Sequence, residues 1–125
     1  MKTVICESTR STPEISFESA ERVFKVKGIS TVVNAFEFYD LAVAWINMNG
    51  RELEGEVHFY FHLPYFNSAS MKGILMLMER IKSGIEEGHS WVIQWNVEDD
   101  DEFLLDACES YSEMLGIPIE ITRNP

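Results

Sequence analysis

The N-terminal part of the chain alternates between apolar and polar residues, which is the pattern of half-buried strands. Residues 2–6, 14–17 and 22–27 carry this alternation. The polar segment 7–13 separates the first two strands and contains Pro13, which interrupts regular strand pairing. Because only a short polar link separates the second and third strands, these two are predicted to form a β-hairpin.

Helical and strand patterns then follow one another. Asn34 can cap a helix that runs to about residue 48, and the aromatic and β-branched residues of 56–63 predict a buried strand. A second helix is predicted after Ser70, ending near residues 87–88. Its buried face is inferred from the helical spacing of apolar residues at positions 71, 74, 75, 78, 81 and 85.

The C-terminal part adds two strands and a helix. A further apolar strand is predicted over 91–97, and the acidic run 98–102 opens a last helix that Gly116 ends. A short edge strand is expected over 118–121. The element order β-β-β-α-β-α-β-α-β predicts one α/β domain over residues 1–125. We expect a mixed sheet of about five to six strands packed with about three helices, with a right-handed parallel crossover around the second helix.

Charge and composition restrict the partners of the chain. The net charge is −11, from 10 basic and 21 acidic residues, so nucleic acid and anionic membranes are poor partners. No apolar stretch reaches the length of a membrane span, and the N-terminus lacks a signal-peptide core, so a cytoplasmic location is expected. Cys6 and Cys108 are predicted to be buried thiols and not a disulfide framework.

The loop between the strand 56–63 and the second helix carries the main candidate site. Asn67, Ser68 and Ser70 lie at the helix start, where a small hydroxyl residue, Ser68 or Ser70, can cap backbone N–H groups. The same N–H groups and the helix dipole would stabilise a phosphate, so Ser68 is also a candidate phosphoacceptor. The spacing alone favours capping over phosphorylation.

Other arrangements of polar residues point to no chemistry. The acidic run 98–102 lacks the glycine and spacing of a calcium loop, and it suits the dipole of the last helix. His58, His62 and His89 have no partner at metal-ligand spacing, so no metal or other cofactor is expected. Neither serine of the loop has the flanking glycines of a nucleophile elbow, and no glycine-rich phosphate loop is present, so the chain is not expected to be an enzyme.

Several stretches together resemble the SiaC family of bacterial regulatory phosphoproteins. They span nearly the whole chain in matching order, and the loop 65–72 is the most specific of them. The others are Thr12-Pro13-Glu14-Ile15, residues 35–39 with Trp45, Trp95 before the acidic run 98–102, and Gly116-Ile117-Pro118-Ile119. The sequence differs from the family pattern in having Ser68 in place of a threonine, Ala69 in place of a second hydroxyl residue, and no Tyr-Pro-Glu in the connector 29–33.

This resemblance implies a STAS-like fold, similar to anti-sigma-factor antagonists, and a phosphoacceptor directly after the asparagine of the loop. That position is Ser68 here, with Ser70 as the second choice. The family's kinase has a histidine-kinase-like ATPase fold, its phosphatase is of the PP2C type, and the unphosphorylated protein activates a diguanylate cyclase in cyclic-di-GMP and biofilm signalling. The implied partner-binding residues are Asn67, Ser68, Ser70 and Lys72.

Two other functions are weighed against this one. In the first, the chain is a constitutive binding or scaffold module in which Ser68 only caps the helix. In the second, it is a small enzyme, which needs an acid–base or nucleophile constellation that the sequence does not display; a pocket with convergent polar groups and a perturbed pKa would revive it. Of the three, the phosphorylation-controlled partner switch accounts best for both the loop and the resemblance.

Overall fold

A computed structural model gives the fold, and it describes residues 1–98 and 101–124. The described residues form six strands, three α-helices and a short 3₁₀ turn, in the order that the hydrophobic pattern predicts. The elements are β1 (Lys2–Cys6), β2 (Glu14–Glu18), β3 (Val23–Lys27), α1 (Ala35–Asn49), η1 (Gly50–Glu52), β4 (Val57–His62), α2 (Ser68–Glu86), β5 (Trp91–Glu98), α3 (Glu102–Leu115) and β6 (Ile119–Asn124).

The six strands form one mixed sheet in which spatial order follows sequence order, β1-β2-β3-β4-β5-β6. The predicted hairpin of β2 and β3 is confirmed, because the two pair antiparallel with Ser16 opposite Lys25. From β3 onward every neighbouring pair is parallel. Each parallel step therefore requires a crossover, and α1, α2 and α3 provide the three crossovers.

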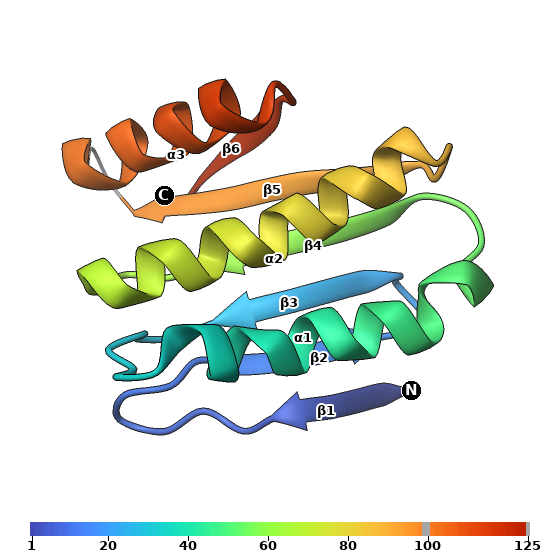
Figure 1. The fold of residues 1–125 in the computed structure, drawn as a ribbon, viewed down its shortest axis with the longest axis horizontal. Helices are drawn as coiled ribbons and strands as arrows, with labels where there is room; N and C mark the ends of the chain where they lie inside the picture. Colours follow the sequence, from blue (N-terminus) through green and yellow to red (C-terminus); the bar gives the residue numbers. More distant parts are fainter. Residues whose placement is uncertain (99–100, 125) are drawn as a thin grey trace.

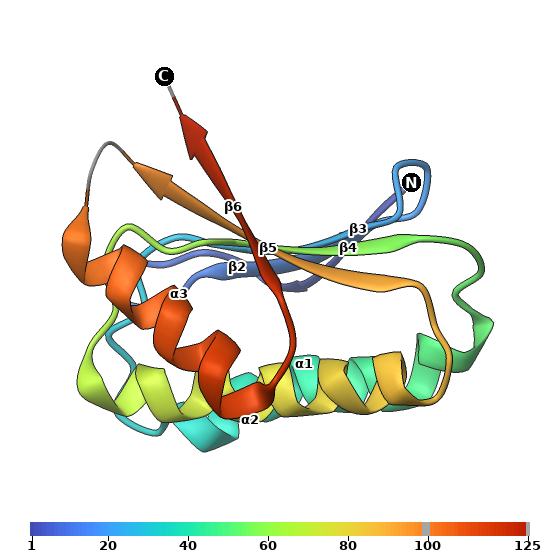
Figure 2. The ribbon, with the colours of Figure 1, turned by 90° about the horizontal axis from the view of Figure 1, so that it is seen from above.

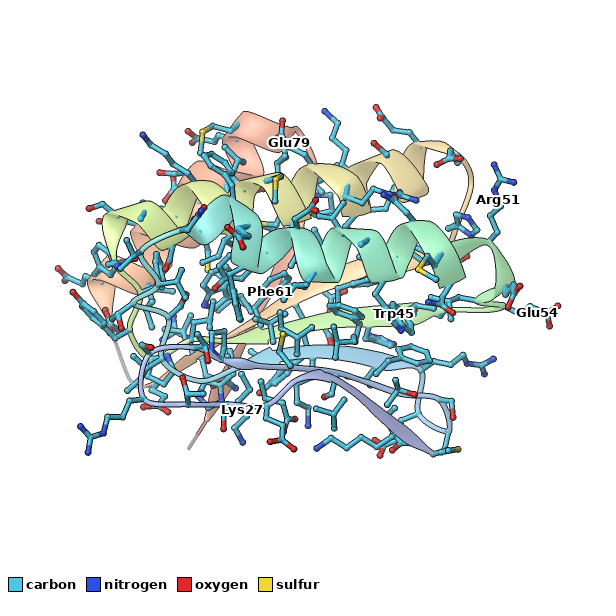
Figure 3. All side chains as sticks on the ribbon, turned by 60° about the horizontal axis from the view of Figure 1, so that its bottom comes forward. Lys27, Trp45, Arg51, Glu54, Phe61 and Glu79 are labelled. Atoms are coloured by element: carbon cyan, nitrogen blue, oxygen red, sulfur yellow. The ribbon has the colours of Figure 1, made fainter. Side chains whose placement is uncertain are left out.

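All three helices cover the same face of the sheet, and the other face is bare (Figures 1 and 2). The strands alternate accordingly: Phe59 and Phe61 of β4 are fully buried, while His58 and Tyr60, which alternate with them, are half-buried. In Figure 3, Trp45 and Phe61 lie between helices and sheet, whereas Lys27 extends from the opposite face. The apolar core is therefore a single layer on the helix side.

Trp91 and Trp95 of β5 contribute two large aromatic side chains to this core. Both are buried, as predicted for at least two of the three tryptophans, and the ring of Trp95 stacks on Phe61 at 5.4 Å between centroids. Trp45 of α1 is half-buried against Phe17 and lies at the margin of the core. These large rings fix the distance between each helix and the sheet.

The buried face of α2 differs from the predicted one. Positions 74, 78 and 81 are buried as expected, whereas 71, 75 and 85 are only half-buried. Three of the buried positions are small residues, which apolar periodicity does not detect: Ser70, Gly73 and Gly84. A Cβ atom at Gly84 would lie 1.9 Å from Cζ3 of Trp91. The helix therefore approaches its neighbours through its smallest side chains.

The cysteine prediction is confirmed for one residue. Cys108 is buried in α3, whereas Cys6 at the end of β1 is half-buried, and both are free thiols. Burial raises the pKa of Cys108 to about 12. Within the described residues, no helix is both long and apolar enough to cross a membrane.

Candidate functional site

The carboxyl ends of β3, β4 and β5 lie at the same end of the sheet, where the chain leaves each strand and continues into a helix (Figure 1). The N-termini of α1 and α2 therefore lie beside each other. The loop before α2 is joined to the connector before α1, because the N–H of Asn67 donates to the carbonyl of Ser30 at 3.0 Å and Ser30 forms a parallel bridge with Phe66. The carboxyl ends of the strands are where α/β sheets commonly have their binding sites.

Asn67, and not a serine, caps α2. Its side-chain oxygen accepts from the backbone N–H of Ser70 at 2.9 Å, and the helix begins at Ser68. The prediction that α2 starts after Ser70 with a serine cap was therefore wrong. The reason is that an asparagine before two hydroxyl residues is an equally good cap, and position alone does not rank the three. Ser68 is therefore not the helix cap that the scaffold alternative assumed.

This assignment predicts different stabilities for two alanine variants. Asn67→Ala removes the acceptor of the Ser70 N–H and is expected to lower the free energy of unfolding by about 1 kcal/mol. Ser68→Ala removes an exposed hydroxyl and is expected to change it by less than about 0.5 kcal/mol. Urea unfolding of both variants measures the difference. A larger loss in Ser68→Ala than in Asn67→Ala would contradict the assignment.

Ser70 lies in the core, with no exposed surface. Its hydroxyl donates to the carbonyl of Ser30 at 2.9 Å and accepts from the Ser30 hydroxyl at 2.7 Å. The hydroxyl proton of Ser30 is used in this hydrogen bond to Ser70. The phenol of Tyr39, whose oxygen lies 2.7 Å from the hydroxyl oxygen of Ser30, must therefore donate to Ser30. The expectation that Ser70 contributes to an exposed partner-binding surface is therefore wrong, and its hydroxyl instead links α2 to α1 through Ser30.

The sequence reading missed Ser30 and the hydroxyl of Tyr39. Nothing local marks Ser30 in the connector 29–33, because its role depends on pairing with a loop far along the chain. Tyr39 does carry a signal, since a tyrosine at a core-facing helix position requires a partner for its hydroxyl. Tyr111 follows the same rule and donates to the carbonyl of Met71 at 2.8 Å, which joins α3 to the first turn of α2.

Because the phenol of Tyr39 is buried, we expect the stability of the fold to decline at alkaline pH. Burial raises its pKa to about 12 from an ordinary value of 10.0. A raised folded pKa means that the stabilisation is complete below about pH 10 and is lost as the pH rises through about 12. Tyr39→Phe is expected to lose about 1 kcal/mol at neutral pH, through its hydrogen bond to Ser30, but to decline less steeply above pH 10.

Urea unfolding at a series of pH values from neutrality to about pH 11 measures both effects. Tyr111 and Cys108, whose pKa values burial also raises, remain in the variant, so part of the alkaline decline persists. Equal slopes for wild type and Tyr39→Phe would show that Tyr39 ionises no later in the folded than in the unfolded chain.

Ser68 lies on an exposed surface with apolar side chains on both sides. It lines a hollow of about 540 Å³ together with Pro64, Tyr65, Phe66, Asn67, Met71, Asp101 and Phe103, and we call these eight residues the Ser68 surface. Tyr65 is 55% exposed and Phe103 is 53% exposed. The ring of Phe103 packs against that of Phe66, with 5.5 Å between the ring centroids. The sequence reading missed Phe103, because its place in the last helix does not indicate that it meets the loop.

Lys72 is exposed and lies one helical turn after Ser68, so the two side chains share a face of α2. None of the ion pairs among the described residues includes Lys72. The predicted partner-binding residues Asn67, Ser68 and Lys72 are thus brought together at one helix start, and Ser70 is separated from them by burial.

The remaining candidates have structural roles. Asp101 caps α3 by accepting from the N–H of Leu104 at 3.2 Å, while Asp99 and Asp100 of the acidic run lie outside the described residues. His62 contacts the carboxylate of Glu98 at 2.9 Å. In the part of the chain that the structure describes, no three His, Cys, Asp or Glu side chains are placed to hold a metal ion.

Comparison with known proteins agrees with this architecture. The solved structure of SiaC of Pseudomonas aeruginosa superposes with a TM-score of 0.83 at 17% identity, covering 99% of each chain. Its apo form gives a TM-score of 0.81 at 18% identity over 98% of each chain. A crystal structure of the diguanylate cyclase SiaD in complex with its activator SiaC from the same organism gives 0.81 at 19% identity, over 94% of this chain and 96% of that chain.

These identities show a shared fold and no more. No curated protein sequence matches the chain. A family model does: the one described as SiaC family regulatory phosphoprotein matches residues 6–124. Since that match covers nearly the whole chain and the fold is that of solved SiaC proteins, the chain belongs to the SiaC family of regulatory phosphoproteins.

Proposed function

We propose that the chain is a non-enzymatic partner switch controlled by phosphorylation of Ser68. Unphosphorylated, it docks on a diguanylate cyclase through the Ser68 surface and Lys72 and activates it. Phosphorylated, it releases the cyclase. A kinase with a histidine-kinase-like ATPase fold and a PP2C-type phosphatase set the balance in the cytoplasm, where ATP is available. The proposal places the chain in cyclic-di-GMP and biofilm signalling.

The observation that carries the proposal is the position of Ser68. Its side chain is exposed at the first residue of α2, and Asn67 already caps the helix, so the Ser68 hydroxyl is available to a kinase. The backbone N–H groups of Ser68 and Ala69 have no acceptor among the described residues. They can donate to a phosphate that also gains from the helix dipole. Ser70, by contrast, is inaccessible to a kinase.

The surroundings of Ser68 support a docking role. Exposed aromatic residues such as Tyr65 and Phe103 are enriched at the centres of protein interfaces, where they are fully desolvated on binding. A phosphate among them would bring nearly two negative charges into that region. It would also draw Lys72, one turn away, toward itself and away from the partner. Both effects favour release.

The partner is proposed from the family. A solved SiaC protein with this fold forms a complex with a diguanylate cyclase of which it is the activator. The family is described as a regulatory phosphoprotein family, which supports a role in signalling and not in catalysis.

Mapping of the phosphate tests the proposal. Wild type, Ser68→Ala and Ser70→Ala are incubated with ATP and a lysate of the source cells, and phosphopeptides are located by mass spectrometry. We expect phosphate on Ser68 in wild type and in Ser70→Ala, and none in Ser68→Ala. If no form carries phosphate while a control substrate is labelled in the same lysate, the switch is refuted and the constitutive binding module is favoured.

A further inference from the structure

A positively charged surface lies on the bare face of the sheet. Figure 2 shows this face opposite the helices. A hollow of about 630 Å³ opens there, over the ends of β1, β2 and β3 and the β1–β2 loop. Four of the 10 basic residues of the chain line it, with a single carboxylate, and we call these five residues the basic hollow: Lys2, Arg10, Glu14, Lys25 and Lys27. A chain of net charge −11 thus concentrates positive charge at one place.

Strand geometry forces the charges together. Lys25 and Lys27 are two residues apart on β3, so both side chains leave the sheet on the bare face. The cross-strand neighbours of these lysines on β2 are Ser16 and Glu14. Figure 3 shows Lys27 extending from this face. Arg10 and the hydroxyl residues Ser8 and Thr9 reach the same hollow from the β1–β2 loop.

The one carboxylate of the hollow is already engaged. Glu14 pairs with Lys2 at 3.0 Å and accepts from the hydroxyl of Ser16 at 3.1 Å. These contacts, the hydrogen bond from Lys2 first, hold the pKa of Glu14 below its ordinary value. Within the described residues no ion pair includes Arg10, Lys25 or Lys27. Three cations therefore share the hollow without a salt bridge, and its four basic residues outnumber its one carboxylate, although acidic residues outnumber basic ones in the chain by about two to one.

The acidic margin of the hollow limits the size of its ligand. Glu18 and Glu21 line an adjoining hollow that shares Lys2 and Lys25. On the other side, Lys27 is in register with His62, whose ring contacts the half-exposed carboxylate of Glu98. A long polyanion such as nucleic acid, or an anionic membrane, would extend over these carboxylates and be repelled. A short run of carboxylates would not.

We propose that the basic hollow is a second docking surface, which binds an acidic segment of a protein partner. The site opens along the face of β2 and β3, which suits a peptide segment lying across strands. It does not include Ser68 and lies on the opposite side of the sheet from α2, so it does not depend on the phosphorylation switch. Its contribution is specificity and association rate, as expected of complementary charge at an interface.

The test uses a fluorescent peptide of six glutamates at about 50 mM salt, where screening is weak. Anisotropy is measured with wild type, with Lys25→Gln/Lys27→Gln, and with Arg51→Gln/Lys82→Gln, which removes the same charge outside both the basic hollow and the Ser68 surface. We expect saturable binding to wild type, at least tenfold weaker binding to the β3 variant, and less than twofold change in the Arg51/Lys82 variant. Amide shifts in the NMR spectrum should be confined to residues 2–28. Circular dichroism checks that both variants are folded.

Several outcomes would overturn the proposal. These are the absence of saturable peptide binding to folded wild type, equal weakening by the two charge-matched variants, and shifts located elsewhere on the chain. A hexathymidine oligonucleotide is titrated in parallel. If it binds the basic hollow more tightly than the peptide does, the occupant is a nucleic acid and not an acidic protein segment.

Discussion

Replacement of Ser68 by aspartate is expected to weaken binding of the diguanylate cyclase by about a hundredfold, or about 2.8 kcal/mol. A carboxylate at this position stands beside Tyr65 and Phe103, where docking would remove it from water without a partner charge. Uncompensated or like charge at an interface costs several kcal/mol. Isothermal calorimetry with the purified cyclase measures the change.

The same substitution should not damage the fold. An acidic side chain in the first turn of α2 interacts favourably with the helix dipole, so Ser68→Asp is expected to keep its stability or gain about 0.3–1 kcal/mol. A variant that is more stable but binds less well separates the interface effect from unfolding. Ser110→Asp, at an exposed position of α3, adds the same charge elsewhere and should bind like wild type. Equal losses in the two variants would show that net charge, and not position 68, controls binding.

Gly73→Ala is expected to lower the free energy of unfolding by about 2 kcal/mol, although alanine is the better helix former. The added Cβ would lie 2.6 Å from Cδ2 of Tyr39 and 2.9 Å from the carbonyl oxygen of Ala35. Neither atom can give way easily, because one belongs to the backbone of α1 and the other to a buried ring held by its hydrogen bond to Ser30. Helix α2 must therefore move away from α1.

Chemical denaturation of Gly73→Ala beside Ser83→Ala measures this effect. Ser83 is exposed on the same helix, so its replacement by alanine should leave stability unchanged or raise it slightly. Stabilisation by Gly73→Ala, the ordinary result for glycine within a helix, would show that the close contact between α1 and α2 is absent in solution.

Local patterns predicted the elements of this fold because each one buries an apolar face of regular period. The hairpin of β2 and β3 and the parallel crossover around α2 follow from the short links between neighbouring elements, whereas the crossovers around α1 and α3 were not predicted. The strand order β1-β2-β3-β4-β5-β6 could not be predicted. It depends on which side of a strand each crossover places the next strand, and no local sequence pattern encodes that side. The start of α2 was misplaced because each of the three polar residues among positions 67–70 could cap it, and only the hydrogen bond seen in the structure assigns that role to Asn67.

The candidate site was predictable only in its location. The loop before α2 and the exposed Ser68 follow from the strand-loop-helix pattern and the family resemblance. The burial of Ser70 does not, because it depends on Ser30, which lies 40 residues earlier in the chain. The contribution of Phe103 likewise arises where α3 meets the loop. Residues that act through long-range contacts leave no periodic signal.

The central claim is that a phosphate on Ser68 governs docking on a diguanylate cyclase. The most direct test compares one preparation of the chain before and after stoichiometric phosphorylation, with the site verified by mass spectrometry and the affinity for the cyclase measured by calorimetry. The account predicts tight binding of the unphosphorylated chain, loss of at least about a hundredfold in affinity with the phosphate, and recovery after phosphatase treatment. Equal affinity of the two forms would contradict it.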